Sequence, residues 1–400
     1  MNKKIYLDYA ATTPVDKKVL AKMLPYFSDD FGNPSSVHNM GQTAMNALDE
    51  TRQKVASFLN SQMSEIFFTS GATESNNLAI RGALSHYYAK NGKNAAKPHF
   101  LTSTIEHHCV LETIEDLQKS DLIEATFLTV DSQGLVNIAK LEEAIRENTI
   151  FVSIMYVNNE IGTIEPIAEI GNLIKKLNIE RKNKILFHTD AVQAINYLDC
   201  DVQKLGVDLL SFSAHKFYGP KGTGALYVKK GTPLKEIQTG GAQEFNLRAG
   251  TQNVPAIAGL GIALDEIKNI DASQISKLRD YLIEKVLKEI PASYLNGPRE
   301  NRSPNNANFR FDNIEGEGLL LSLDMEGICA STGSACSSGS LSPSHVLLAL
   351  GLKHEQAHGS LRLTLGKHTT QEEIDFTVEK IKEIIERLRK ISGNVLSEFK

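Results

Sequence analysis

A lysine, an aspartate and a histidine each stand within four residues of the end of a short strand-like run. Lys216 follows LLSFS, Asp190 follows KILFH and His107 follows HFLTS. A lysine that is removed from water is a nucleophile able to form an imine. A carboxylate can face a protonated ring nitrogen, and a histidine can stack on a ring or carry a proton. Taken singly, these residues are more often a surface lysine, a helix cap and a structural histidine. The interpretation as a functional site therefore depends on all three standing at the ends of strand-like runs.

A glycine turn between a strand-like run and a helical pattern could bind an anion. The segment SGATESN follows Ile66–Thr69 and opens a helix, with Ala72 and Thr73 near its start. Glycine lets the backbone approach a ligand closely, and a helix N-terminus offers N–H groups with partial positive charge. An ordinary helix cap is the alternative for this segment alone. A second glycine-rich stretch, GPKGTG at 219–224, lacks the residue order of a nucleotide-binding P-loop.

Two amide side chains stand at similar places. Gln193 comes three residues after Asp190, and Asn159 follows the apolar run IFVSIMYV. The amide of Asn159 could contact a ligand, or it could simply satisfy backbone groups at the end of the strand. Cys109 lies close to His107, which would suit zinc, but no CxxC or HxxxH spacing supports a metal site. We therefore expect no metal.

The elements that position these residues follow from the alternation of strand-like runs with helical patterns. We expect strands at Ile66–Thr69, His99–Ser103, 125–130, 150–157, 184–188, 208–213 and 225–228, with intervening helices at 71–84, 109–118, 138–146 and Ile167–Leu177. Strands separated by single helices imply right-handed crossovers and a largely parallel sheet with helices on both faces. Ligands of such sheets bind beyond the carboxyl ends of the strands. The fold class is therefore α/β, with the candidate residues meeting at one edge of the sheet.

The groups gathered at that edge match one cofactor. Pyridoxal 5'-phosphate requires an imine lysine, a carboxylate for its pyridinium nitrogen, a donor for its phenolic oxygen and a phosphate site. Lys216, Asp190 and Gln193 supply the first three, and the turn before Thr73 supplies the fourth. The sequence therefore predicts a pyridoxal-phosphate enzyme.

The pattern changes at about residue 253. We expect helices at 253–268, 275–290, 318–325 and 371–389, strands at 308–311 and 360–365, and a loop of small polar residues at 331–341. This mixture without strict alternation predicts a smaller α+β domain at the C-terminal side. The expected division is 15–260 for the large cofactor-binding domain, and 1–14 together with 261–400 for the small domain that carries the 331–341 loop.

Composition limits the classes of protein. The 400 residues are 41% hydrophobic and 23% charged, with a formal net charge of −5. This balance argues against a broad basic face for nucleic acid, and we expect no direct nucleic-acid binding. We expect no signal peptide and no membrane helix, because no apolar run reaches about 18 residues. Four cysteines are too few for a disulfide framework, which favours a reducing cytoplasm.

Several segments resemble those of one known family: YLDYAATTP (6–14), FGNPSSVH (31–38), FTSGATESNN (68–77), VNNEIG (157–162), HTDAVQ (188–193), SFSAHKFYGPKG (211–222), RAGTQN (248–253) and STGSACSSGS (331–340). They occur in the same order over nearly the whole chain and resemble the cysteine desulfurases, more narrowly the NifS/IscS class. The resemblance implies the aspartate-aminotransferase-like fold, pyridoxal-phosphate fold type I. It also implies a homodimer with the active site between subunits.

The resemblance implies this set of cofactor-binding residues: Ala72, Thr73, His107, Asp190, Gln193, Ser213, His215, Lys216 and Thr251. Lys216 would form the imine, and His107 would stack on the ring. Thr251 would reach the phosphate bound in the partner subunit, whereas Thr73, Ser213 and His215 would hold the phosphate bound in their own subunit.

The catalytic residues implied by the resemblance are Cys336, Lys216 and His107. L-Cysteine would be the substrate, with its carboxylate held by Asn159 and Arg362. Sulfur would pass to Cys336 as a persulfide, and alanine would leave. Lys216 would shuttle protons at the α-carbon, and His107 would exchange a proton with the substrate thiol or the departing group.

The other cysteines, Cys109, Cys200 and Cys329, are expected to be packed or incidental. The implied acceptors of sulfur are proteins, either an iron–sulfur scaffold or a tRNA-thiolating enzyme. Cys336 could contact an iron–sulfur cluster on such a partner.

Other reactions on the same scaffold remain alternatives at this point: selenocysteine lyase, cysteine sulfinate desulfination and transamination. A transaminase would not need Cys336. A scaffold subunit without catalysis is a further alternative, against which the presence of Lys216, Asp190 and Cys336 argues.

Overall fold

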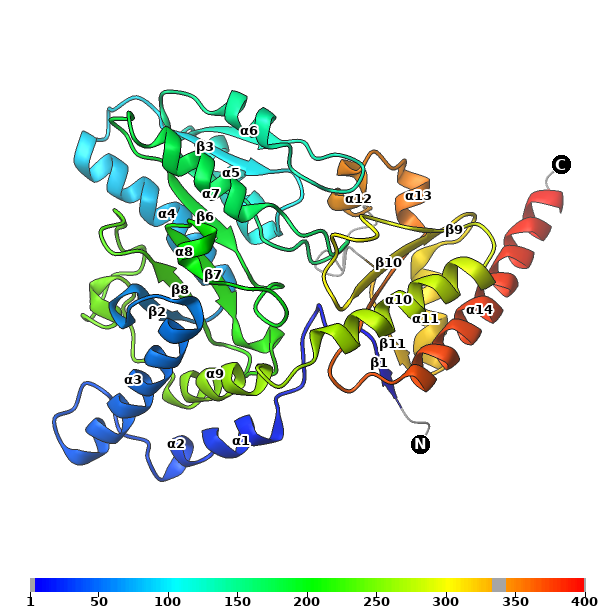
Figure 1. The fold of residues 1–400 in the computed structure, drawn as a ribbon, viewed down its shortest axis with the longest axis horizontal. Coiled ribbons are helices and arrows are strands. Elements are labelled where there is room, and N and C mark those ends of the chain that lie inside the picture. The colour runs from blue at the N-terminus through cyan, green and yellow to red at the C-terminus, as the bar shows by residue number, and fades with distance from the viewer. Residues whose placement is uncertain (1–3, 333–342, 399–400) are drawn as a thin grey trace.

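The main sheet of the computed structural model has seven strands in the order β2-β8-β7-β6-β5-β3-β4 (Figure 1). The structure describes residues 4–332 and 343–398, so Cys336 lies outside the described residues. The strands are β2 (Ile66–Thr69), β3 (His99–Ser103), β4 (Glu124–Leu128), β5 (Thr149–Ser153), β6 (Leu186–Asp190), β7 (Leu209–Ser213) and β8 (Gly224–Val228). All pairs from β4 to β7 are parallel, whereas β8 is antiparallel to both β7 and β2. The carboxyl ends of all strands except β8 therefore meet at one edge.

Helices cover both faces of this sheet because neighbouring strand residues enter different cores. In β3, Phe100 packs with α4 (Ala72–Asn91) and α5 (His108–Lys119), whereas Leu101 packs in the cluster on the other face. That opposite face is covered by α3 (Asn39–Leu59), α7 (Ile167–Leu177) and α9 (Val254–Ile267). Alternation of side chains with a period of two thus separates two apolar layers. The mostly parallel, mixed α/β sheet is confirmed.

Shorter helices complete this part of the chain: α1 (Lys17–Met23), α2 (Pro25–Ser28), α6 (Ile138–Ala144) and α8 (Val202–Leu205). The N-terminus of α6 is capped, because the side-chain oxygen of Asn137 accepts a hydrogen bond from the Lys140 amide at 3.1 Å. Such caps satisfy N–H groups that the first helical turn leaves without a partner.

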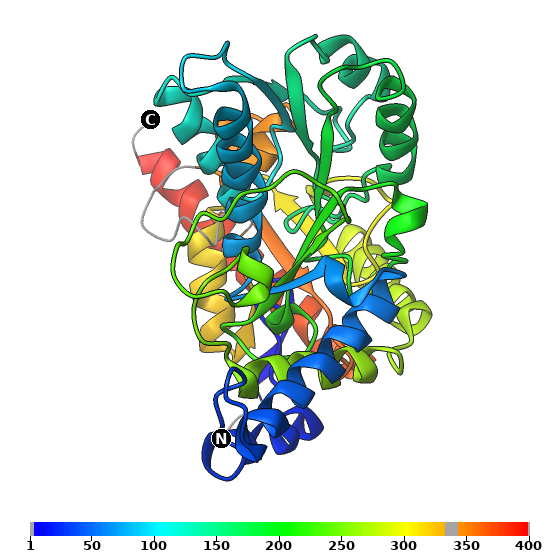
Figure 2. The ribbon, with the colours of Figure 1, turned by 90° about the vertical axis from the view of Figure 1, so that its left-hand side faces the viewer.

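A second apolar cluster brings the N-terminal segment together with the C-terminal part of the chain. Its sheets are β12-β10-β9, antiparallel, and β1-β11, parallel. Their strands are β1 (Ile5–Tyr6), β9 (Ser293–Leu295), β10 (Asn306–Phe311), β11 (Ile328–Cys329) and β12 (Ser360–Thr364). The helices of the C-terminal part of the chain are α10 (Ala272–Glu289), α11 (Gly316–Met325), α12 (His345–Ala349), α13 (His354–His358) and α14 (Gln371–Glu398), of which α12 and α13 pack in a separate small apolar cluster. Figures 1 and 2 show α14 lying beside α11.

The predicted division at residues 15 and 260 stays a prediction. Leu7 belongs to the apolar cluster of the C-terminal part, as the division expects. Helix α9, which packs against α1 and α3, continues to Ile267. None of the described helices combines the length and the apolar character that a membrane crossing requires.

Candidate active site

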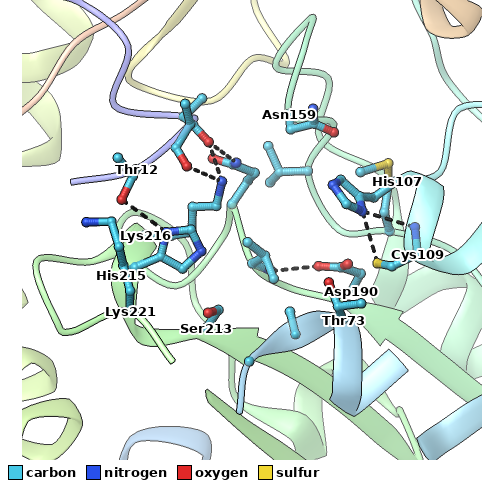
Figure 3. A pocket seen from close by; sticks show the side chains of 18 of the residues that line it. Thr12, Thr73, His107, Cys109, Asn159, Asp190, Ser213, His215, Lys216 and Lys221 are labelled. Atoms are coloured by element: carbon cyan, nitrogen blue, oxygen red, sulfur yellow. Dashed lines mark hydrogen bonds between the residues drawn. The ribbon is translucent and has the colours of Figure 1, made fainter. Parts of the chain in front are cut away.

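A cavity of about 560 Å³ lies at the carboxyl edge of the main sheet (Figure 3). The predicted site residues that line it are Ala72, Thr73, His107, Asn159, Asp190, Gln193, Ser213, His215, Lys216 and Arg362. Thr251 is exposed and is not one of the lining residues. Cys336, the remaining predicted residue, lies outside the described residues.

Lys216 is held by the N-terminal segment of the chain. It ends a short 3₁₀ turn, Ala214–Lys216, that follows β7. Its Nζ donates hydrogen bonds to the carbonyl oxygens of Ala10 at 2.6 Å and Ala11 at 2.8 Å. Gln193 Nε2 donates to the same Ala10 oxygen at 3.0 Å. The amine and the amide predicted from separate strand ends thus share one carbonyl, a contact that spacing along the sequence does not reveal.

Asp190 ends β6 as a buried carboxylate, only 5% exposed. Its Oδ1 accepts a hydrogen bond from the Val192 amide at 3.0 Å, and its Oδ2 accepts one from Asn76 Nδ2 at 2.7 Å. A buried charge needs hydrogen bonds and an opposite charge. The carboxylate therefore suits the protonated nitrogen of a bound ring.

His107 caps α5 at the side of the cavity (Figure 3). Its Nδ1 accepts a hydrogen bond from the Cys109 amide at 3.2 Å and lies 3.0 Å from Cys109 Sγ. Burial lowers the pKa of His107, and the opposing attraction of Asp190 is smaller. The imidazole is consequently mainly neutral at pH 7.

The opposite end of the cavity suits a phosphate. Gly71 precedes α4 with φ +149°, a conformation that side chains rarely adopt, and an added Cβ would lie 3.4 Å from Ser213 Oγ. His215 Nδ1 lies 3.1 Å from Thr12 Oγ1. Burial, with Lys216 and Lys221 nearby, lowers the pKa of His215 to about 4. An anion bound here could accept hydrogen bonds from the helix N-terminus, a hydroxyl, a neutral imidazole and lysine side chains.

One acid stands in the first turn of α4, and it is neutralised. Glu74 Oε1 accepts a hydrogen bond from Arg248 Nε at 2.7 Å, and its Oε2 accepts one from the Ser70 amide at 2.6 Å. Burial alone would raise the pKa of Glu74, but Arg248 and Ser70 together lower it. The carboxylate therefore opposes a bound phosphate less than an unpaired acid would.

Arg362 lies in β12 and is 3% exposed, and one nitrogen of its guanidinium group lacks a hydrogen-bond partner among the described residues. Its side chain donates to Asp8 Oδ1 at 2.8 Å and to the Asn159 carbonyl at 3.1 Å. Its buried Nε has no hydrogen-bond partner among the described residues. An unsatisfied buried donor is costly, and a carboxylate in the cavity would satisfy it.

Several contacts in this site were not predicted. Asp8 pairs with Arg362, Asn76 pairs with Asp190, and the carbonyl of Ala10 accepts from Lys216. Cys109 was expected to be packed or incidental; it packs against an apolar cluster, and it also lines the cavity and contacts His107.

The expectation of packing holds for another cysteine. Cys200 is 2% exposed within the main core.

The residues present fit pyridoxal phosphate, since one cavity is lined by a lysine for its amine link, a carboxylate for its ring nitrogen and donors for its phosphate. A mostly parallel sheet with these groups at its carboxyl edge defines a pyridoxal-phosphate enzyme of fold type I.

Comparisons with known proteins give the family. The model of the aminotransferase class-V family matches residues 5–376. Cysteine desulfurase IscS of Dictyoglomus turgidum is 50% identical over 395 residues, which is 98% of this chain and 97% of that protein. A solved structure titled NifS-like protein has 38% identity and a TM-score of 0.86, covering 96% of this chain and all of that one. The structure of SspA in complex with cysteine has 39% identity and a TM-score of 0.80, covering 92% and 100%. The chain belongs to the class-V aminotransferase family and, within it, to the pyridoxal-phosphate-dependent cysteine desulfurases.

Proposed function

We propose that Lys216, His107 and Cys336 convert L-cysteine to L-alanine and that the sulfur stays on Cys336 as a persulfide. The observation that carries this proposal is the cavity that holds Lys216, His107 and Asp190 together at the carboxyl edge of the sheet. The membership of the chain in the cysteine desulfurases supports the same reaction.

Each cofactor-binding role is assigned to a group of fitting chemistry. Lys216 would hold the aldehyde carbon covalently, Asp190 the ring nitrogen and Gln193 the phenolic oxygen. The phosphate would be held by Ala72, Thr73, Ser213 and His215. When bound, pyridoxal phosphate withdraws electrons from the substrate α-carbon.

The chain's own residues would then bind, orient and move protons. Arg362 would hold the substrate carboxylate with Asn159, and Lys216 Nζ would carry protons at the α-carbon. The thiolate of Cys336 would attack the substrate sulfur, so that a sulfur–sulfur bond forms as the carbon–sulfur bond breaks. His107 would exchange a proton with the sulfur or the departing group. In sum, one thiol and L-cysteine give one persulfide and L-alanine, without an external oxidant.

The role of Arg362 can be tested by Arg362→Lys. A lysine keeps the charge but loses the planar fork and the Nε donor, so KM for L-cysteine should rise by about 10–100-fold. The measurement is alanine formation against L-cysteine concentration, with cofactor content checked by visible absorption. Arg81→Lys is the control, because Arg81 pairs with Asp116 on the surface and does not line the cavity. An unchanged KM in Arg362→Lys would exclude the proposed carboxylate site.

We also propose a homodimer. Thr251 is exposed and lies outside the lining of its own cavity, which agrees with a role at the phosphate of a partner subunit. Large apolar side chains are exposed around α2, among them Leu24 (56%), Phe27 (62%) and Phe31 (69%). Light scattering should give twice the chain mass of 44.0 kDa. The mass of a single chain would contradict the dimer.

The acceptors we propose are an iron–sulfur scaffold or a tRNA-thiolating enzyme, in the cytoplasm. A reducing compartment would keep Cys336 able to react, and the cysteines within the described residues, Cys109, Cys200 and Cys329, form no disulfide. Radioactive sulfur from labelled L-cysteine should move from the chain to one of these acceptors when they are mixed. Label that stays on the chain with both would contradict the proposal.

A further inference from the structure

Cys109 stands in the middle of a hydrogen-bonded set that links the two ring-facing groups of the cavity. Its Sγ lies 3.0 Å from His107 Nδ1 and 3.1 Å from Asn76 Nδ2. The same Asn76 nitrogen donates to Asp190 Oδ2 at 2.7 Å. The set therefore runs from the carboxylate through the amide and the thiol to the imidazole.

We propose that Cys109 is a positioning residue whose thiol donates to Nδ1 of His107 and keeps the proton of the neutral imidazole on Nε2. Through Asn76, the same thiol ties the orientation of His107 to that of Asp190. This inference rests on the proposed role of His107 and specifies which of its nitrogens can face the substrate.

The direction of each hydrogen bond follows from the chemistry of the partners. A carboxylate only accepts, so Asn76 must turn its NH₂ group toward Asp190, and its second N–H reaches Cys109 Sγ. The sulfur accepts from Asn76 and from the Thr73 hydroxyl, so its own proton is left for His107. Nδ1 also accepts from the Cys109 amide at 3.2 Å. Two donors thus converge on Nδ1, and a neutral imidazole then carries its proton on Nε2.

The thiol stays protonated in this setting. Burial, reinforced by the negative charge of Asp190, raises the pKa of Cys109 to about 12. A thiolate–imidazolium pair would need the opposite shift. This setting disfavours the thiolate that a second sulfur acceptor would need, although Cys109 lies against the cavity.

The consequence for the reaction concerns the Nε2 atom of His107. The neutral imidazole offers an N–H donor there and no lone pair, so His107 holds a proton at Nε2, donates it as a hydrogen bond to the sulfur or the departing group, and does not remove a proton with Nδ1. A hydrogen bond to the neutral form disfavours the charged form. In the proposed arrangement the thiol would act in the same direction as burial, which is the main cause that lowers the pKa of His107.

The test is the titration of His107 in the full-length holoprotein labelled with nitrogen-15 histidine, followed by NMR and assigned with His107→Gln. In the wild type, the neutral form should show Nδ1 without a proton and Nε2 with one. Cys109→Ala should raise the pKa of His107 by about half to one unit, because a donor to the neutral form is lost. Cys109→Ser, which keeps a hydroxyl donor, should restore most of the difference.

The other titratable groups around His107 remain in every variant: Asp190, Lys216, His108, Glu112 and His345. Cys200→Ala is the matched control, since it removes a buried thiol that is not among the residues lining the cavity. An unchanged titration in Cys109→Ala, or a neutral His107 with its proton on Nδ1, would overturn the inference. Because the titration needs no turnover, it is independent of alanine formation, and active enzyme with an unchanged titration would contradict only the role of Cys109.

Discussion

The substitution Lys216→Ala should lower kcat/KM for L-cysteine by about 10³-fold or more, because it removes both the proton carrier and the residue that binds the cofactor covalently. Within the cavity, the amine of Lys216 is oriented by the hydrogen bonds that it donates to the carbonyl oxygens of Ala10 and Ala11. The visible absorption of the lysine–cofactor link should disappear from the variant as well. Alanine formation and the absorption spectrum measure the two effects separately.

Lys221→Ala is the matched control for Lys216. Lys221 lines the same cavity and affects the charge near the phosphate end. Its removal should weaken cofactor binding, while the absorption of the lysine–cofactor link remains. If Lys216→Ala kept more than about a tenth of the wild-type rate, the assignment of Lys216 would be wrong.

Cys336→Ser should reduce alanine formation from L-cysteine by about 10³-fold or more, because a serine hydroxyl is not ionised at neutral pH and does not form a persulfide. Binding of L-cysteine should persist, since the proposed carboxylate and amine contacts lie elsewhere. The measurement is alanine formed with a thiol reductant present, beside the spectral change on adding L-cysteine.

Cys329→Ser is the control for this variant, because Cys329 lies in β11, seven residues before Cys336. Its activity should equal that of the wild type. Full activity of Cys336→Ser, or loss of activity in Cys329→Ser alone, would contradict the role of Cys336.

The main sheet was predictable because its strands are short apolar runs at regular intervals. Strands β2 and β3 and helix α7 have the bounds that the sequence predicts. The convergence of Lys216, Asp190 and His107 followed from one rule, that the ends of parallel strands meet at one edge.

Helix α3 was not predicted, although it has 21 residues. Its buried face includes small or polar residues such as Ala44, Ala47 and Thr51, and it packs closely on α9. Small residues that permit close helix contact give a weak apolar period, so the tertiary contact decides the structure there. The two-residue strands β1 and β11 are likewise too short for a periodic signal.

The missed contacts of the site share a physical cause. Asn76 and Asp190 are 114 residues apart, and Asp8 and Arg362 are 354 apart. No local pattern links such residues before the chain folds. The sequence predicts which side chains belong to the site, but it does not predict the hydrogen-bond partners that orient them.

The central claim is tested most directly by a single turnover of the holoprotein with one equivalent of L-cysteine and no reductant. The products to measure are free alanine and the mass of each cysteine-containing peptide. The account predicts one alanine per chain and one added sulfur atom on the peptide that contains Cys336. Alanine formed with the added sulfur on Cys109 or Cys329, or with no sulfur on the chain, would contradict it.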